Sequence, residues 1–300
     1  MVTMLIADSN TLGAAVLAVL LISALVTVVV WWWRAPLTVG QTFLWLVNYL
    51  VARLIWGTQV EGKLPVQPGK GAVIVANHRS SIDPSFIQTC IRQVVYWMVA
   101  REYCEAPFLG SLLRIFQVIP VGRGGVDTAA TKLAIRLAQQ GGLVGMFPEG
   151  RINETPGTLL LPGRPGAALV ALKARVPIIP VFISGSPYDG TALGPLRMRA
   201  HVRVKIGEPI DISEYYGREK EEGITQEITK RLLWEMACLA GHPEFEPQLA
   251  GRRWKPGEEE SDNANGGGKP SVPAADAQLH HNSGSNGRIG NPAPRETLPG

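Results

Sequence analysis

The stretch from Val73 to Phe86 reads VIVANHRSSIDPSF, and the interpretation of the whole chain starts from it. Its apolar, β-branched beginning extends back over residues 72–76 and has the length of a buried strand. Polar residues follow at once, with His78 near the strand end and Asp83 after a short spacer. A proline after the acid favours the first turn of a helix. The stretch therefore predicts a strand, a loop that carries an imidazole and a carboxylate, and a helix.

The residues His78 and Asp83 have two interpretations. An aspartate before a proline is a common helix N-cap, and a single loop histidine needs no special role. Together, however, a histidine at a strand end and an acid at a helix start come within hydrogen-bond reach across the turn. The carboxylate then fixes the ring tautomer and stabilises the imidazolium formed when the other ring nitrogen takes a proton. The pair is a candidate general base.

The candidate base has no nucleophile beside it on the enzyme. The sequence contains no GxSxG nucleophile elbow, and Ser80 and Ser81 are interpreted as turn residues. We therefore expect His78 to activate a hydroxyl of a substrate, so that a group is transferred directly to that hydroxyl.

Short apolar runs alternate with helical segments after Val60. Strand-like runs rich in β-branched residues cover 72–76, 94–100, 142–147, 178–183 and 201–206, and helical patterns cover 84–92, 127–140, 166–175 and 224–241. Asp127 is a candidate N-cap and Gly141 a candidate helix stop. This alternation predicts an α/β fold with a mixed, largely parallel sheet flanked by helices. Ligand sites of such folds gather at the carboxyl ends of the strands.

The N-terminal region is strongly apolar. Residues 12–33 contain no charged side chain, and as a helix they would extend roughly 33 Å, which is enough to cross a bilayer. No Lys or Arg precedes this run, whereas Arg34 and Arg53 follow it, and the three tryptophans at 31–33 would lie among the headgroups. We expect residues 1–34 to be an uncleaved membrane anchor, with the catalytic domain on the cytoplasmic side.

Residues 35–57 form a second apolar segment, interrupted by Gln41, Asn48 and Arg53. Its composition favours an interfacial helix anchored by Trp45 and Trp56. A buried helix of the folded domain is the alternative, because periodicity alone does not separate the two.

Composition bounds the remaining features of the chain. The 300 residues carry a formal net charge of +4, and residues 255–300 hold an acidic, apolar-poor composition typical of a disordered low-complexity tail. We place the catalytic domain at 58–250. Its basic character suits anionic partners such as membrane surfaces or phosphorylated metabolites. Cys90, Cys104 and Cys238 form no CxxC pair, so neither disulfides nor a zinc knuckle is predicted and a reducing compartment fits best.

Four blocks of sequence resemble one known family. NHRSSID is similar to the asparagine plus His-x4-Asp signature of the glycerolipid acyltransferases, the lysophosphatidate (1-acyl-sn-glycerol-3-phosphate) acyltransferase family. The further blocks follow in the family's order, RIFQVIPVGR at 114–123, FPEGR at 147–151 and VPIIPV at 176–181. Four ordered blocks over roughly residues 58–215 are far more specific than one motif. The third block departs from the family pattern, because it lacks a threonine between glycine and arginine.

The resemblance implies transfer of a fatty acyl group from an acyl thioester to the free hydroxyl of lysophosphatidate, which gives phosphatidate in phospholipid biosynthesis. His78 would be the base and Asp83 its orienting partner. Coenzyme A or acyl carrier protein would carry the donor, the acceptor would come from the membrane, and no cofactor, metal or nucleic acid is implied. Arginine suits phosphate because it donates in a planar fork, and glycine permits close backbone approach. The expected acceptor-binding residues are Asn77, Arg123, Glu149, Gly150, Arg151 and Arg164.

Several alternatives stay open from the sequence. Arg123 is equally a surface charge in a flexible turn, and Arg151 an ion-pair partner of Glu149 or Glu154. The acceptor is alternatively glycerol 3-phosphate, another lysophospholipid or a lipid alcohol. From other classes come a membrane-associated metal-dependent hydrolase with His78 and Asp83 as ligands, and a non-catalytic lipid-binding scaffold.

Overall fold

The computed structural model describes residues 9–33, 37–67, 69–122 and 127–251, with residues 9–12, 28 and 31–33 described by their backbone alone. The described residues exclude Arg34, Arg123 and the predicted tail at 255–300. They also exclude residues 1–8 of the predicted anchor. Thr155–Leu159 form a unit separate from the rest, with a turn in which the Thr158 N–H donates to the Thr155 carbonyl (3.4 Å).

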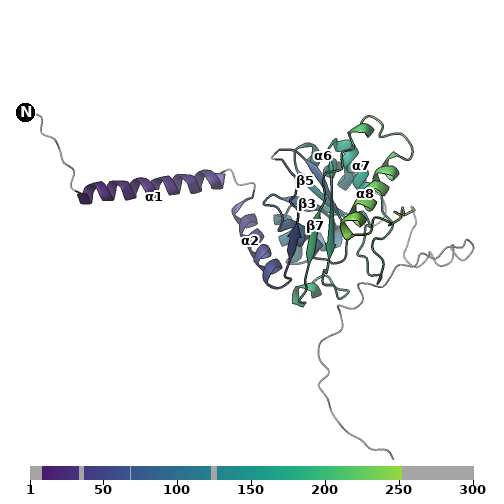
Figure 1. Cartoon of the computed structure of the whole chain (residues 1–300), viewed down its shortest axis with the longest axis horizontal. Helices are drawn as coiled ribbons and strands as arrows, with labels where there is room; N and C mark the ends of the chain where they lie inside the picture. Colours follow the sequence, from purple (N-terminus) through teal and green to yellow (C-terminus); the bar gives the residue numbers. More distant parts are fainter. Residues whose placement is uncertain (1–8, 34–36, 68, 123–126, 252–300) are drawn as a thin grey trace, which may run out of the picture. The chain divides into compact units, whose positions relative to one another are not determined.

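In the residues that the structure describes, a single mixed sheet of seven strands organises the fold (Figure 1). All neighbouring strands are parallel except β6 and β7, which are antiparallel, so the predicted mixed, largely parallel sheet is confirmed. The order across the sheet is β1 (Gln59–Glu61), β7 (Arg203–Ile206), β6 (Ile178–Ser184), β2 (Ala72–Ala76), β5 (Leu143–Met146), β3 (Val95–Ala100) and β4 (Ile119–Val121).

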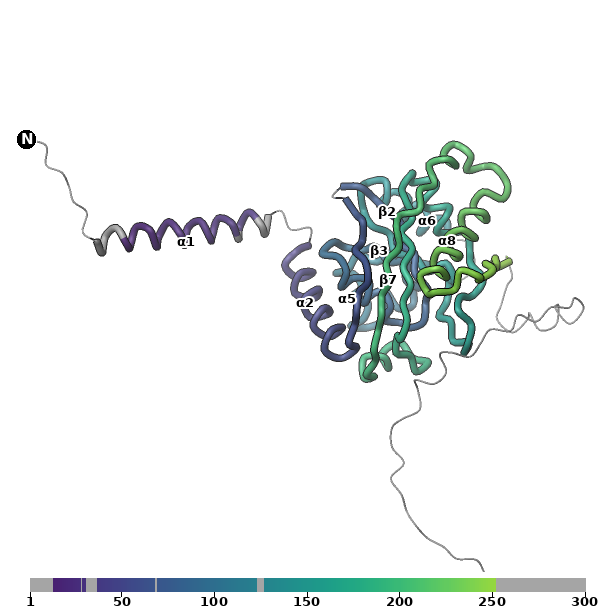
Figure 2. The backbone as a smooth tube through the Cα atoms, in the orientation of Figure 1, coloured from purple at the N-terminus to yellow at the C-terminus, as the bar shows by residue number. Residues whose placement is uncertain are grey.

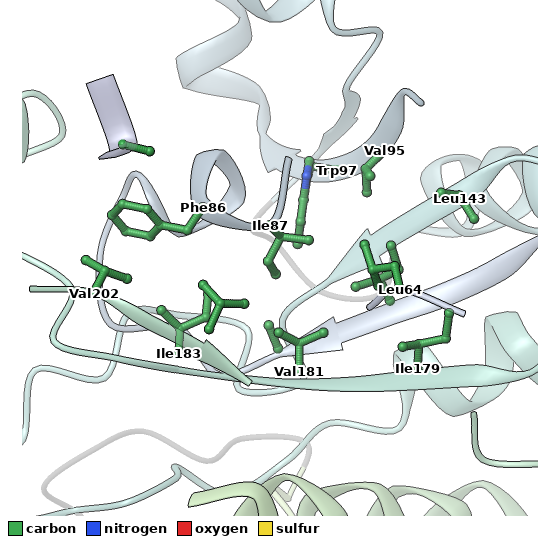
Figure 3. Packing of buried hydrophobic residues seen from close by; sticks show 14 of the residues in the cluster. Leu64, Phe86, Ile87, Val95, Trp97, Leu143, Ile179, Val181, Ile183 and Val202 are labelled. Carbon is green, nitrogen blue, oxygen red and sulfur yellow. The ribbon is translucent and has the colours of Figure 1, made fainter. Parts of the chain in front are cut away.

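Helices cover both faces of this sheet, which explains why every residue of β2 is buried. On one face, α6 (Thr128–Gln139), α7 (Gly166–Ala174) and α8 (Ile224–Ala240) contact β5, β2 and β6 in turn. On the other face lie α2 (Val39–Leu54) and α3 (Asp83–Gln88). Figure 3 shows Phe86 and Ile87 of α3 packed near Ile183 and Val181 of β6, in the hydrophobic core that this face buries.

The predicted helix signals at Asp127 and Gly141 are confirmed. The Asp127 carboxylate accepts from the Ala130 N–H (2.9 Å) and from the Gly122 N–H (3.0 Å), which caps α6. After the helix, Gly141 adopts φ +88°, a left-handed conformation that glycine reaches without steric cost.

The five predicted strands all form, with ends that differ from the prediction by at most two residues. The sequence patterns missed six short elements. These are β1, β4, α4 (Arg101–Glu105), α5 (Leu109–Ile115) and the 3₁₀ turns η1 (Gly194–Arg197) and η2 (Ser213–Tyr215).

The predicted membrane span lies on α1 (Ser9–Trp33), so the expected helix forms. Within the residues that the structure describes, however, no helix meets the length and apolarity needed to cross a membrane. The prediction of a transmembrane anchor at residues 1–34 is therefore not confirmed.

The second apolar segment forms α2, and its polar residues dock it on the domain. The side-chain amide of Gln41 donates to the Ile115 carbonyl (2.8 Å), and that of Asn48 donates to the Ser85 carbonyl (2.8 Å). The prediction that Trp45 and Trp56 anchor this helix in a membrane interface is wrong, because both side chains contact the domain. The Trp45 indole donates to the Gln88 and Ile91 carbonyls (both 3.0 Å), and Trp56 is fully buried.

Candidate active site

The candidate site lies at the carboxyl edge shared by β2, β5 and β6. His78 follows β2 by two residues, Glu149 follows β5 by three, and Ser186 follows β6 by two. Because these three strands are parallel neighbours, their carboxyl ends meet at one edge of the sheet. Residues that are far apart in the sequence therefore become neighbours.

The structure brings His78 and Asp83 together as predicted. Nδ1 of His78 lies 3.0 Å from Oδ2 of Asp83, which is completely buried, while the His78 side chain stays 17% exposed. The same Oδ2 accepts from the backbone N–H of Arg79 (2.6 Å) and of Ser80 (2.7 Å), and Oδ1 accepts from the Ser186 hydroxyl (2.7 Å). A carboxylate surrounded by donors only accepts, so Nδ1 of His78 carries the proton and Nε2 has a free lone pair.

The helix-cap interpretation of Asp83 does not describe its contacts. Asp83 is the first residue of α3, whose N-cap is Ile82, and no side-chain hydrogen bond caps this helix. The carboxylate instead turns back onto the preceding loop and holds it by the two backbone N–H groups. Asp83 thus orders the loop and the imidazole together.

Asn77 faces the sheet and not the open edge. Its side-chain N–H donates to the Ile183 carbonyl (2.8 Å), its Oδ1 accepts from the Ile183 N–H (2.7 Å), and the residue is fully buried. Both polar groups of the amide are thus used by the backbone of β6. We correct its predicted role from an acceptor contact to a side-chain extension of the β2–β6 pairing.

Glu149 is also buried and is held by the main chain. Oε1 accepts from the His78 N–H (2.8 Å) and Oε2 from the Leu161 N–H (2.8 Å). Burial raises the pKa of Glu149 to about 7, and the backbone hydrogen bonds and nearby Arg79 oppose the rise. Glu149 therefore holds the backbone of His78, whereas Asp83 holds its ring.

The turn after Glu149 presents two exposed guanidinium groups. Gly150 adopts φ +68°, and a side chain there would lie 3.1 Å from Cδ and Nε of Arg164. The Arg164 backbone N–H donates to the Pro148 carbonyl (2.8 Å), which ties this arginine to the same turn. In the described part of the chain, neither Arg151 nor Arg164 has a side-chain hydrogen bond or an ion pair. The alternative pairing of Arg151 with Glu149 or Glu154 is not formed.

Sequence reasoning missed several residues around His78. Arg79 is half-buried, its guanidinium donates to the Asn153 carbonyl (3.2 Å), and burial lowers its pKa against the pull of Glu149 and Asp83. Arg79 lies inside the His-x4-Asp spacer, so the motif itself pointed to it. Ser186 had only one signal, a small polar residue just beyond a strand end. Across the described ranges, no group of three or more His, Cys, Asp or Glu side chains is arranged to hold a metal ion.

Comparison with known proteins defines the class of this enzyme. Residues 57–184 match the family model described as Acyltransferase. The 1-acyl-sn-glycerol-3-phosphate acyltransferase of Haemophilus influenzae is 30% identical over 166 residues, which cover 54% of this chain and 68% of the relative. That of Bacillus subtilis is 25% identical over 189 residues, which cover 61% of this chain and 90% of the relative. The protein is an acyltransferase.

The same relatives give the family. A solved structure of the Thermotoga maritima 1-acyl-sn-glycerophosphate (LPA) acyltransferase, PlsC, matches with a TM-score of 0.45 and 24% identity over 58% of this chain and 69% of that one. The chain belongs to the 1-acyl-sn-glycerol-3-phosphate acyltransferase family.

The raised pKa of Glu149 predicts a pH-dependent stability. Between about pH 4.5 and pH 7 the folded chain keeps a proton that the unfolded chain releases, so the stabilisation present at low pH is lost as the pH rises through 7. We expect the free energy of unfolding of the wild type to fall by up to about 1.4 kcal/mol per pH unit more than that of Glu149→Gln. Urea unfolding at pH 5, 6, 7 and 8 measures both, with Glu154→Gln as the control for loss of an exposed carboxylate. Parallel curves for wild type and Glu149→Gln would contradict the shift.

Proposed function

We propose that this enzyme transfers a fatty acyl group from an acyl thioester to the free hydroxyl of lysophosphatidate, forming phosphatidate. The observation that carries the proposal is the His78–Asp83 pair at the sheet edge. Asp83 is saturated by donors, so the imidazole is held as the tautomer whose Nε2 accepts a proton. Coenzyme A or acyl carrier protein carries the acyl group in this proposal, and no further cofactor takes part.

The reaction follows from that tautomer. Nε2 of His78 takes the proton of the acceptor hydroxyl while its oxygen attacks the thioester carbonyl carbon, and the carbon–sulfur bond then breaks. The leaving thiolate receives the proton from the imidazolium, so the enzyme ends as it began. Asp83 stabilises the imidazolium between the two proton transfers. No covalent acyl-enzyme is needed, which agrees with the burial of Ser80.

The exposed arginines support a phosphate on the acceptor. Arg151 directly follows Glu149 and Gly150 at the edge that carries His78, the Arg164 backbone is hydrogen-bonded to the same turn, and the described residues leave both guanidinium groups unpaired. A phosphate takes bidentate donors of this kind, and the altered third block then has a physical reading. Arg164 supplies a second guanidinium beside Gly150, where the family's threonine is missing.

The proposed role of His78 as the base predicts a loss of acyl transfer when the imidazole is removed. His78→Ala should lower acyl transfer by about 10²-fold or more, because a general base contributes about 10²- to 10⁴-fold. The measurement is transfer of labelled acyl from acyl-coenzyme A, and separately from acyl carrier protein, to lysophosphatidate, glycerol 3-phosphate and lysophosphatidylcholine. His242→Ala is the matched control, since His242 is exposed and bonds only to Glu244 among the described side chains. Substantial transfer by His78→Ala would remove His78 as the base, and transfer to another acceptor alone would replace lysophosphatidate.

The phosphate site predicts a second outcome. Arg151→Ala should raise the KM for lysophosphatidate by about tenfold, because a charge-assisted hydrogen bond is worth about 1.5–3 kcal/mol, and should leave the KM for the acyl donor unchanged. Steady-state kinetics in both substrates measure the two values, with exposed Arg197→Ala as the control. An unchanged KM for lysophosphatidate would assign Arg151 to the general surface.

We also propose that the α2 surface attaches the catalytic domain to the membrane on the side where the acyl donor is made, the cytoplasm. Gln41 and Asn48 of α2 face the domain, while six apolar side chains of the helix are exposed. We call them the α2 apolar face: Val39, Phe43, Leu46, Val47, Leu50 and Leu54. Figure 2 shows α5 beside α2. Leu112 and Ile115 of α5 are also exposed, and Phe108, which directly precedes α5, is 92% exposed. Exposed apolar side chains gathered on two neighbouring helices suit the interface of a bilayer.

The α2 apolar face predicts a difference between two forms of the acceptor. Phe43→Glu combined with Leu50→Glu should lower transfer to vesicle-embedded lysophosphatidate by about tenfold or more, since each burial is worth about 1.5–3 kcal/mol. Transfer to a short-chain, water-soluble lysophosphatidate should not change. Leu133→Glu on α6 is the control, because Leu133 is an exposed leucine on the other side of the sheet. Equal activity of the double variant on both acceptor forms would contradict the attachment.

A further inference from the structure

Three aromatic rings form a stack that ends on the imidazole of His78. The rings of His78 and Phe147 lie with centroids 3.9 Å apart at an interplanar angle of 8°, and those of Phe147 and Trp97 lie 4.8 Å apart at 18°. The stack runs from the sheet edge into the core, where Trp97 is almost fully buried. The hydrogen bonds of the site do not account for this stacking.

The strand register builds the stack. Gly145 of β5 is the partner of Ile74 on β2 and of Trp97 on β3. Side chains alternate between the two faces of a sheet, so Phe147, two residues after Gly145, lies on the same face as Trp97. His78 continues the alternation of Ile74 on β2. Three adjacent strands thus deliver one ring each.

Gly145 makes room for the innermost ring. A side chain at this position would lie 2.5 Å from Cδ2 and Cε3 of Trp97, which is closer than carbon atoms approach in proteins. Only the missing side chain lets the indole lie across β5 and support Phe147. Figure 3 shows Trp97 within the buried cluster, beyond Ile87 of α3.

The indole N–H indicates that the Trp97 ring is present for its faces. Its Nε1 is buried, and within the described residues it has no hydrogen-bond partner. An unpaired buried donor destabilises the fold, and a smaller apolar side chain would avoid that penalty. What the indole supplies instead is a broad, rigid surface behind Phe147.

The stack and the Asp83 hydrogen bond restrain different motions of the imidazole. The bond to Oδ2 fixes where Nδ1 points, but it permits the ring plane to turn about that direction. Contact with the Phe147 face fixes the plane. With both restraints Nε2 has one direction, which is the requirement for proton removal from a bound hydroxyl.

We propose that Phe147 is a positioning residue for the His78 base, supported from behind by Trp97 in the space that Gly145 leaves. This inference rests on the proposed function, in which His78 takes the proton of the acceptor hydroxyl. Phe147 acts through the imidazole and binds neither substrate, so its removal changes the rate of the chemical step and not the binding of substrates.

The test compares two identical substitutions in the full chain. Phe147→Leu should lower kcat by about threefold to tenfold, the range that stacked aromatic pairs contribute, with both KM values within about twofold of wild type. Phe147→Tyr keeps a ring and should recover most of kcat. Phe182→Leu is the matched control, because Phe182 is a buried phenylalanine of β6 whose neighbours in the strand, Val181 and Ile183, face the core around the stack. Its kcat should stay near wild type.

A second readout does not depend on activity. The ring of Phe147 shifts the Cε1 proton resonance of His78 upfield, and the resonance is assigned by its loss in His78→Gln. Phe147→Leu should remove the shift, whereas Phe182→Leu should keep it. Equal kcat for Phe147→Leu and Phe182→Leu, or an unchanged His78 resonance in Phe147→Leu, would overturn the proposal. A wild type that transfers no acyl group to any acceptor would overturn the proposed function. In that case the His78 resonance alone would test whether Phe147 stacks on the imidazole.

Discussion

The buried carboxylate of Asp83 is the interaction on which the site depends. It binds the imidazole of His78, two backbone N–H groups of the loop after β2, and the Ser186 hydroxyl from the loop after β6. One side chain therefore joins a strand end, a turn, a helix start and a neighbouring loop. A buried charge needs this many partners, since each missing donor would leave part of it desolvated and unpaired. The same saturation that makes the carboxylate tolerable in the interior also determines the tautomer of His78.

Glu149 restrains the same loop from its other side, by a different chemistry. It bonds the main chain of His78 and of Leu161, so it holds the backbone where Asp83 and Phe147 hold the ring. The backbone, the ring edge and the ring face of His78 are thus contacted by three residues, two from the loop after β5 and one from α3. Positioning of this kind is the main resource of a direct transfer such as the one we propose, which forms no covalent enzyme intermediate.

The strands rich in β-branched residues and the pairing of His78 with Asp83 were predictable from the sequence, because both follow from local patterns. The α2 helix was predictable in extent, but its orientation was not. Gln41 and Asn48 appeared to interrupt an apolar segment, whereas they are the contacts that dock the helix on α5 and α3. Asn77 was assigned to the substrate for a related reason, since a sequence does not show that Ile183 will pair with its amide. Ser186 and the Trp97–Phe147 stack depend on strand register, which no local pattern contains.

The direction of the short strand β1 determines where α2 ends relative to the base. β1 is parallel to β7, and β7 is antiparallel to β6, so β1 runs opposite to β2. The chain leaves α2 at the catalytic edge, where Trp56 bonds to the Pro195 and Met198 carbonyls of the loop after β6, and β1 carries it away. β2 then returns to the same edge and delivers His78. If the chain crossed the sheet once fewer or once more between α2 and His78, the end of α2 and the imidazole would lie at opposite ends of the strands. A five-residue strand would then separate them by about 17 Å. In the proposed attachment through α2, this even number of passes shortens the path from the bilayer to the imidazole of His78.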